Sequence, residues 1–213
     1  MKKANQHHIV KKENLSMKIN QGILFFFLLL FCAFSFGQDK IKRAYEISPA
    51  QKPQKLVLLE FENQSYRGYI ITELEHLSEE QNIEIIDKHY LDSLNVQKLM
   101  SKLKQQGIEE LESCYNKKCG EYTNYHGGGY VSFKIENESI REFRLRDIYP
   151  LTKNYKYVET NKVRRNAQMV LTTIFNYIDF SIELSNLMKK LPKGIYTWRP
   201  NGTGYYSEIR NKM

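Results

Sequence analysis

The feature that most limits the fold is an apolar run near the amino terminus of this 213-residue chain. Ile23–Phe36 contains no charged residue, and five lysines precede it, at positions 2, 3, 11, 12 and 18. A membrane-spanning helix needs about 20 apolar residues, so a run of this length is short for a span. Ser35 and Gly37 stand where a signal peptidase requires small residues. We therefore predict that residues 1–37 are a signal peptide, cleaved before Gln38.

Three alternatives for this leader stay open. The run could remain uncleaved and anchor the protein in the inner membrane. Met17 could be the true start, because the stretch that follows it is a more usual beginning for a signal peptide. Lipidation at Cys32 is less favoured, since the bulky Phe31 precedes the cysteine where lipoproteins carry a small residue.

Removing the leader changes the charge of the chain. The full sequence holds 32 basic and 24 acidic residues, a net charge of +8, and the leader holds five lysines and Glu13. The remainder is therefore 27 against 23, or +4, which is weak support for nucleic-acid binding. The 176 residues after the leader are enough for one domain. We expect a linker over 38–54, a single domain over 55–213, no nucleic-acid partner, and membrane contact only through the leader.

The apolar pattern predicts an α/β fold, more specifically an α+β mixed sheet. Apolar or alternating stretches indicate strands near 56–62, 82–91, 131–136 and 140–148, and a closing hairpin over 194–210. Helical spacing indicates helices after Ser93, with Gly107 ending that helix, over 160–180, and over 184–191. With a further helix over 65–81, the order is β-α-β-α-β-β-α-α-β-β. We expect a two-layer sandwich of helices on a mixed sheet.

The segment 65–81 fits two patterns. As a strand it places Glu73 and Glu75 on one face with Tyr69 and Ile71. As a helix it forms an apolar stripe of Ile70, Ile71, Leu74 and Leu77, although Gly68 disfavours a helix. We favour the helix.

The segment from Cys114 to Tyr130, "CYNKKCGEYTNYHGGGY", is the strongest candidate for a site. In an exported protein, two cysteines with four residues between them more often form a disulfide than stay free. A C-x4-C spacing with one histidine, His126, is not a recognisable zinc site. The "HGGG" stretch resembles the oxyanion loop of lipases, but no G-x-S-x-G nucleophile motif accompanies it. We predict a Cys114–Cys119 disulfide, no metal and no catalytic residue.

Tyrosines are dense in the same segment. Tyrosine provides a large contact area with few torsions to restrict, which suits a binding surface. The candidates for partner binding are Tyr115, Tyr122, Tyr125, His126 and Tyr130. The alternative is that these rings pack against the protein's own sheet.

The order of segments over residues 55–150 resembles one envelope family. "KLVLLEFEN" matches its first strand through Phe61, Glu62 and Asn63, and a helix "YIITELEHL" is expected to follow it. "IEIIDKHYLDSL" then matches the second strand through Asp87, Leu91 and Asp92. The cysteine pair and the strand "YVSFKI" follow in the same order. The chain is thus similar to the α/β domain shared by the curli assembly/transport component CsgG and the TolB amino-terminal domain. This resemblance implies a protein-binding role without catalysis at the periplasmic side of the envelope.

From these observations we expect an exported, non-enzymatic interaction or assembly accessory protein of the cell envelope. Its location would be the periplasm or the extracellular space, its partner another envelope protein, and it would need no cofactor. The alternative is a secreted, hydrolase-like enzyme that uses the Cys114–Tyr130 segment.

Overall fold

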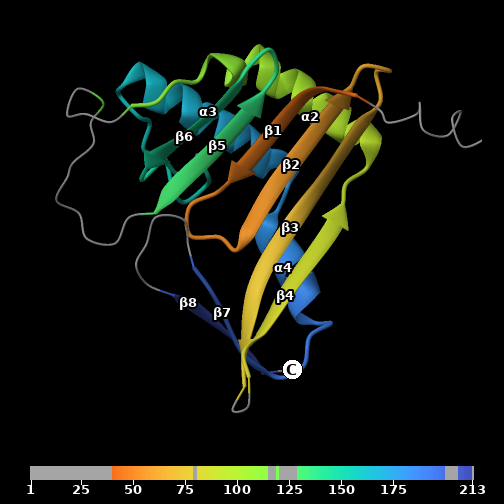
Figure 1. Ribbon diagram of the computed structural model, residues 1–213. Coiled ribbons are helices and arrows are strands. Elements are labelled where there is room, and N and C mark those ends of the chain that lie inside the picture. The colour runs from red at the N-terminus through yellow and green to blue at the C-terminus, as the bar shows by residue number, and fades with distance from the viewer. Residues whose placement is uncertain (1–39, 79–80, 115–118, 120–128, 200–205, 213) are drawn as a thin grey trace, which may run out of the picture. The chain divides into compact units, whose positions relative to one another are not determined.

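The computed structural model describes residues 40–212, except 79–80, 115–118, 120–128 and 200–205. Eight strands in this described part form one sheet with the order β6-β5-β1-β2-β3-β7-β8, and β4 pairs with β3 (Figure 1). The strands are β1 (Ile41–Ser48), β2 (Gln54–Phe61), β3 (Tyr66–Leu77), β4 (Ile83–Tyr90), β5 (Tyr130–Glu136), β6 (Ile140–Arg146), β7 (Gly194–Trp198) and β8 (Ser207–Asn211).

The pairing of these strands is antiparallel throughout, so the predicted α/β class and mixed sheet are wrong. A parallel pair needs a crossover of a dozen or more residues, usually a helix. Here β1, β2, β3 and β4 follow one another through short connections, and no helix separates them. Antiparallel hairpins are the arrangement that such connections allow.

The first strand lies where the sequence predicted a linker. Residues 41–48 form β1, which pairs with β2 on one side and with β5 on the other. Tyr45 and Ile47 of this strand are fully buried, so its short alternating pattern was sufficient for a central strand. The linker prediction is therefore wrong for these residues.

The segment that we predicted as a helix over 65–81 is strand β3 along most of its length. The strand pattern, which places Tyr69 and Ile71 on one face with Glu73 and Glu75, is the one that the structure adopts. Strand β3 is paired along both edges, with β2 and β7 on one and β4 on the other. Those ladders satisfy the backbone groups that a helix would otherwise satisfy internally.

Three predicted helices are confirmed, with slightly different limits. They are α2 (Ser93–Gln105), α3 (Lys162–Tyr177) and α4 (Phe180–Met188), and a short 3-10 turn, η1 (Ile108–Glu110), follows α2. The N-cap of α2 is Asp92, one residue before the expected Ser93, and its side chain accepts from the Asn95 amide at 3.0 Å. Gly107 ends the helix as predicted, with a φ of 76° that favours glycine.

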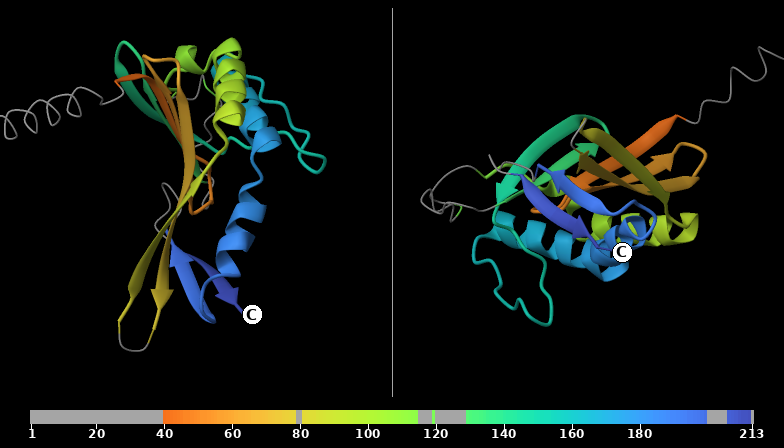
Figure 2. Two further views of the ribbon diagram at one scale, coloured as in Figure 1. Left: turned by 90° about the vertical axis from the view of Figure 1, so that its right-hand side faces the viewer. Right: turned by 90° about the horizontal axis from the view of Figure 1, so that it is seen from below.

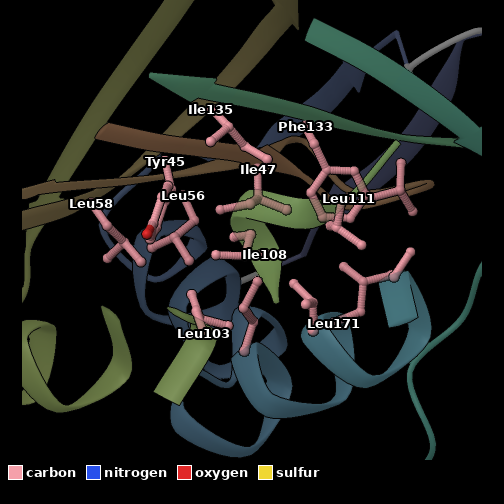
Figure 3. Packing of buried hydrophobic residues seen from close by; sticks show 14 of the residues in the cluster. Tyr45, Ile47, Leu56, Leu58, Leu103, Ile108, Leu111, Phe133, Ile135 and Leu171 are labelled. Carbon is pink, nitrogen blue, oxygen red and sulfur yellow. The ribbon is translucent and has the colours of Figure 1, made fainter. Parts of the chain in front are cut away.

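Helices α2 and α3 cover one face of the sheet (Figure 2). Apolar residues from both layers meet there in the main hydrophobic cluster (Figure 3), which includes Tyr45, Leu56, Leu103, Phe133 and Leu171. A second, smaller cluster forms where α4 packs near β7 and the carboxyl-terminal part of β3, around Leu74, Leu187, Met188 and Tyr196. Strand β3 contributes to both clusters, through Ile70 and Leu74 respectively.

Candidate functional site

The face of the sheet opposite α2 and α3 carries no helix in the described part of the chain, and we call it the open face (Figures 1 and 2). Side chains alternate between the two faces along each strand, and residues directly opposite in neighbouring strands share a face. A strand residue that comes just before or after a core residue therefore lies on the open face, and so does the residue directly opposite it in the neighbouring strand. This rule identifies which side chains the open face presents.

One row of directly opposed residues crosses the open face from β6 to β4. It runs Glu142, Lys134, Glu46, Val57, Tyr69, Tyr90. The first three are charged, and the Lys134 ammonium lies 3.1 Å from the Glu46 carboxylate, a hydrogen bond that raises the pKa of Lys134. The last three are apolar or aromatic. Along this row the open face is charged on β6, β5 and β1 and apolar on β2, β3 and β4, although Glu73, Glu75, Glu84 and Lys88 also lie on the open face of β3 and β4. We call the two sides of the row the charged half and the apolar half.

We call the apolar side chains of the apolar half the open-face patch; they are Val57, Leu59, Tyr69, Ile71, Ile86 and Tyr90. Val57 is buried, and Leu59, Tyr69 and Ile71 are half-buried. Ile86 is 63% exposed and Tyr90 59% exposed. The Tyr69 and Tyr90 rings meet edge to face with 5.9 Å between centroids. The Lys88 ammonium lies 3.6 Å from the Tyr69 centroid and 5.1 Å from the Tyr90 centroid, within range of a cation–π interaction. These contacts hold the two rings in place at the surface.

A groove of about 340 Å³ adjoins the patch near the end of the β3–β4 hairpin. Its charged lining consists of Glu73, Glu75, Glu84 and Arg199. The Arg199 guanidinium donates to the Tyr206 hydroxyl at 2.9 Å and lies 4.9 Å from that ring's centroid. Three carboxylates against one guanidinium give the groove a negative balance, which favours a positively charged group in a bound molecule.

Strand β4 forms one edge of the sheet. In the described part of the chain it pairs with β3 alone. Six of its eight residues are exposed, and they include Ile83, Ile86 and Tyr90. An exposed edge of this length presents backbone donors and acceptors that another strand can pair with.

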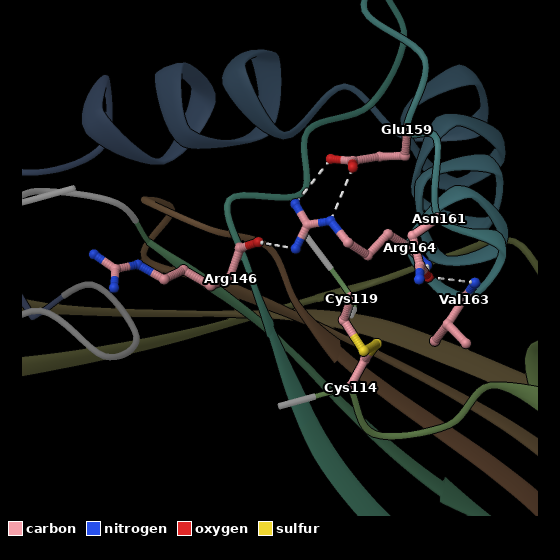
Figure 4. Close-up of a disulfide and its surroundings, with 7 residues drawn as sticks. All are labelled: Cys114, Cys119, Arg146, Glu159, Asn161, Val163 and Arg164. Atoms are coloured by element: carbon pink, nitrogen blue, oxygen red, sulfur yellow. Dashed lines mark hydrogen bonds and ion pairs between the residues drawn. A yellow bond between two sulfur atoms is a disulfide. The ribbon is translucent and has the colours of Figure 1, made fainter. Parts of the chain in front are cut away.

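The predicted Cys114–Tyr130 site is described at its two ends only. Cys114 and Cys119 form a disulfide with 5.7 Å between their Cα atoms (Figure 4). Cys114 is buried in the main hydrophobic cluster. At the other end, the Asp147 amide donates to the Gly129 carbonyl at 3.0 Å, just before β5 begins. Both ends of the segment are thus fixed to the folded domain.

Four of the predicted partner-binding residues, Tyr115, Tyr122, Tyr125 and His126, lie outside the described residues. The fifth, Tyr130, opens β5 and is half-buried. It lies directly opposite Arg146, whose guanidinium carbon is 6.0 Å from the Tyr130 centroid. Because Tyr130 alternates with Val131 of the core, it lies on the open face, on the charged half.

A buried ion pair lies near the disulfide (Figure 4). Arg164 of α3 donates to both carboxylate oxygens of Glu159, at 2.8 and 2.9 Å, and to the Arg146 carbonyl at 2.9 Å. The exposed fractions of the two side chains are 7% and 6%. The pair fixes the segment after β6 onto α3, so it supports the fold around the charged half of the open face.

The open-face patch was not among the sites predicted from the sequence. The signal was present, because the strand pattern of residues 65–81 places Tyr69 and Ile71 on one face. That signal became meaningful only after β3 was known to be a strand, and after its register placed Ile86 and Tyr90 of β4 beside it. Which face the helices cover depends on tertiary packing, which the spacing does not determine.

In the described part of the chain, no group of three or more His, Cys, Asp or Glu side chains is placed to hold a metal ion. None of the helices described is long and apolar enough to cross a membrane. The disulfide is compatible with an exported protein.

The fold and this surface define a class of protein: an antiparallel β-sheet domain with helices over one face and a second face that no helix of the described residues covers. No protein-family model matches the chain, and neither a curated protein nor a solved structure matches it.

Proposed function

We propose that this protein is an exported cell-envelope interaction or assembly accessory protein without enzymatic activity, and that it binds a protein partner through the open face. The observation that carries the proposal is the open-face patch, where aromatic and aliphatic side chains gather on a sheet face that no described helix covers. Ile86 and Tyr90 are exposed beside the half-buried Leu59, Tyr69 and Ile71. Single exposed apolar residues are normal on proteins, whereas an apolar group of adjoining residues supports an interaction site.

The chemistry of the surface suggests the kind of partner segment that fits it. Tyr69 and Tyr90 supply rigid, amphipathic contact area at low cost in conformational entropy. The adjoining groove adds the carboxylates of Glu73, Glu75 and Glu84. A segment with apolar side chains next to a lysine or arginine would satisfy both parts of the surface.

Location in the periplasm or the extracellular space is part of the proposal. The apolar leader and the disulfide support it. The resemblance to the CsgG and TolB domain implies the same compartment, but the helix that it requires at 69–77 is strand β3, so it stays a prediction without support from the fold. The partner is expected to be another envelope protein, and the tyrosines of residues 115–125 are expected to add contacts to it.

Cross-linking in the exporting cell tests the proposal. The cross-linked protein would be identified by mass spectrometry, and its binding to the purified chain would then be measured directly. We expect Ile71→Lys, in the middle of the open face, to weaken that binding by at least about 2 kcal/mol, because it places a charge in the apolar contact. Tyr157→Ser is the matched control, since Tyr157 is 55% exposed and belongs to the segment between β6 and α3, outside the patch. Equal binding by all three proteins would contradict the open face as the binding site.

The alternative, a hydrolase-like enzyme, depends on His126, which lies outside the described residues. A hydrolytic turnover that the purified chain shows and that His126→Ala abolishes would replace the proposed function with that alternative.

A further inference from the structure

In the described part of the chain one edge of β4 is unpaired, and the ladder with β3 determines which residues face that edge. In an antiparallel ladder, residues alternate between those that bond the neighbouring strand and those whose N–H and C=O point away from it. The Leu91 amide donates to the Gly68 carbonyl at 2.9 Å, and these two residues continue the register that pairs Tyr90 with Tyr69. The residues of β4 that bond β3 are therefore the odd-numbered ones.

It follows that four residues of β4 direct their backbone groups outward, to the free edge: Glu84, Ile86, Lys88 and Tyr90. The same four side chains lie on the open face and are exposed. A strand that pairs with β4 must match this outward set, both in its hydrogen bonds and in its side chains.

The outward set is complementary to itself. We propose that β4 pairs antiparallel with β4 of a second copy of this chain, with Ile86 opposite Ile86 on the two-fold axis. In this register Glu84 of each copy lies opposite Lys88 of the other, so two opposite-charge pairs flank a central apolar pair. All three positions belong to the outward set, so each forms a hydrogen-bonded pair across the axis.

Neighbouring two-fold registers fit less well. Moving the axis to residue 87 places Asp87 opposite Asp87, and two carboxylates directly opposite each other repel. Moving it to residue 85 places Glu84 opposite Ile86 and leaves both charge pairs unformed. The register centred on Ile86 is the one that combines backbone pairing with charge complementarity.

Strand β6, at another edge of the sheet, is less suited to such pairing. It carries three arginines against one glutamate, and Ile140 is its one exposed apolar residue. Two copies of β6 would bring six arginines and two glutamates together. Strand β4 instead exposes Ile83, Ile86 and Tyr90.

The pairing would extend the open face across the two-fold axis. Ile86 and Tyr90 belong to the open-face patch, so the dimer joins two patches into one continuous surface. The dimer is inferred from the geometry of β4 alone, so the inference does not depend on the proposed partner. A chain that dimerises and captures no partner would refute only the proposed function.

Charge reversal in the full chain tests the pairing, with the dissociation constant of the dimer measured by analytical ultracentrifugation. Glu84→Lys and Lys88→Glu each convert two attractive pairs into repulsive ones, and each should weaken the dimer about tenfold. The double variant Glu84→Lys/Lys88→Glu restores opposite charges and should recover most of the affinity. A purely monomeric wild-type chain, or a double variant as weak as the sum of the single ones, would overturn the proposal.

A matched pair of isoleucines controls for nonspecific association. Ile86 is 63% exposed on β4 and Ile140 is 64% exposed on β6. Ile86→Lys places two ammonium groups against each other on the axis and should abolish the dimer, whereas Ile140→Lys should leave it intact. Loss of the dimer in Ile140→Lys, or its survival in Ile86→Lys, would contradict the assigned edge.

Amide hydrogen exchange gives a second measurement that needs no substitution. The outward amides of Glu84, Ile86 and Lys88 should become protected as the protein concentration rises, because they bond the second copy. The inward amides of Ile85 and Asp87 bond β3 and should be protected at every concentration. Outward amides whose protection does not change with concentration would count against the dimer.

Discussion

Single residues carry much of the specificity of this fold, and the Arg164–Glu159 pair is the clearest case. Both side chains are almost completely buried, and the guanidinium also bonds the Arg146 carbonyl. Glu159→Gln would leave a buried charge without its counter-charge. We expect it to lower the free energy of unfolding by about 3–5 kcal/mol, measured by urea denaturation.

An exposed pair provides the control for that prediction. Glu208 and Arg210 are joined at 2.7 Å, with exposed fractions of 46% and 66%. Glu208→Gln should leave the free energy of unfolding almost unchanged, because water screens the exposed pair. Equal losses for the two variants would show that burial does not govern the Arg164–Glu159 pair.

Gly68 is required where β3 passes under α2. A Cβ atom at this position would lie 2.6 Å from Cγ2 of Val96 and 3.2 Å from Cδ2 of Leu58. We expect Gly68→Ala to destabilise the protein by about 1–3 kcal/mol through overpacking. Val96→Ala removes the closest contact, so the double variant should be more stable than the sum of the two single losses predicts. Strictly additive losses in thermal unfolding would contradict this packing account.

At the scale of elements, the sequence predicted the helices and strands whose own residue pattern determines their structure. It did not predict the strands whose structure depends on pairing with other segments. The helix α2 was recognised because Val96, Leu99 and Leu103 follow helical spacing and Gly107 ends the helix. The hairpin of β5 and β6 was recognised because Phe133 and Phe143 alternate with polar residues. In both cases one face is buried and the other is exposed to solvent, so the regular spacing of the apolar residues can be recognised in the sequence.

Strands β1 and β3 were not predicted, although β2 and β5, which are also paired along both edges, were. The difference is that β2 has a continuous apolar run and β5 a clear alternation, whereas β1 has only a short alternating stretch and β3 an ambiguous pattern. The pattern of β3 was compatible with helix and strand alike, and the ladders with β2 and β4 decided it. The open-face patch depends on those same ladders, so it could not be located before the topology was known.

The disulfide acts on one connection rather than on the whole fold. It joins two residues that are five positions apart, immediately after η1. In the chain-entropy model, a loop this short contributes about 2 kcal/mol. Replacing both cysteines with serine should lower the free energy of unfolding by about 2 kcal/mol or less, and alkylation without reductant should leave both wild-type cysteines unmodified. Free thiols, or a much larger loss in chemical denaturation, would contradict this role.

For the folded domain as a whole, stability should be uneven because its two hydrophobic clusters differ in size. In the described part of the chain, the main cluster holds 24 buried residues and the second cluster holds four. The free energy of local opening rises with the buried apolar surface that opening exposes. The region of α4, β7 and β8 should therefore open more readily than the region of α2, α3, β5 and β6.

Two matched truncations test this difference. Leu103 is fully buried in the main cluster and Leu187 is 6% exposed in the second. We expect Leu103→Ala to lower the free energy of global unfolding by about 2–5 kcal/mol and to speed amide exchange throughout the domain. Leu187→Ala should speed exchange chiefly in β7, β8 and the part of α4 after Phe180, because Phe180 itself is packed in the main cluster. Strand β3 contributes Ile70 to one cluster and Leu74 to the other, so protection should change along its length, between these two residues. Uniform exchange along β3, with equal global losses for both variants, would show that the two clusters unfold as one unit.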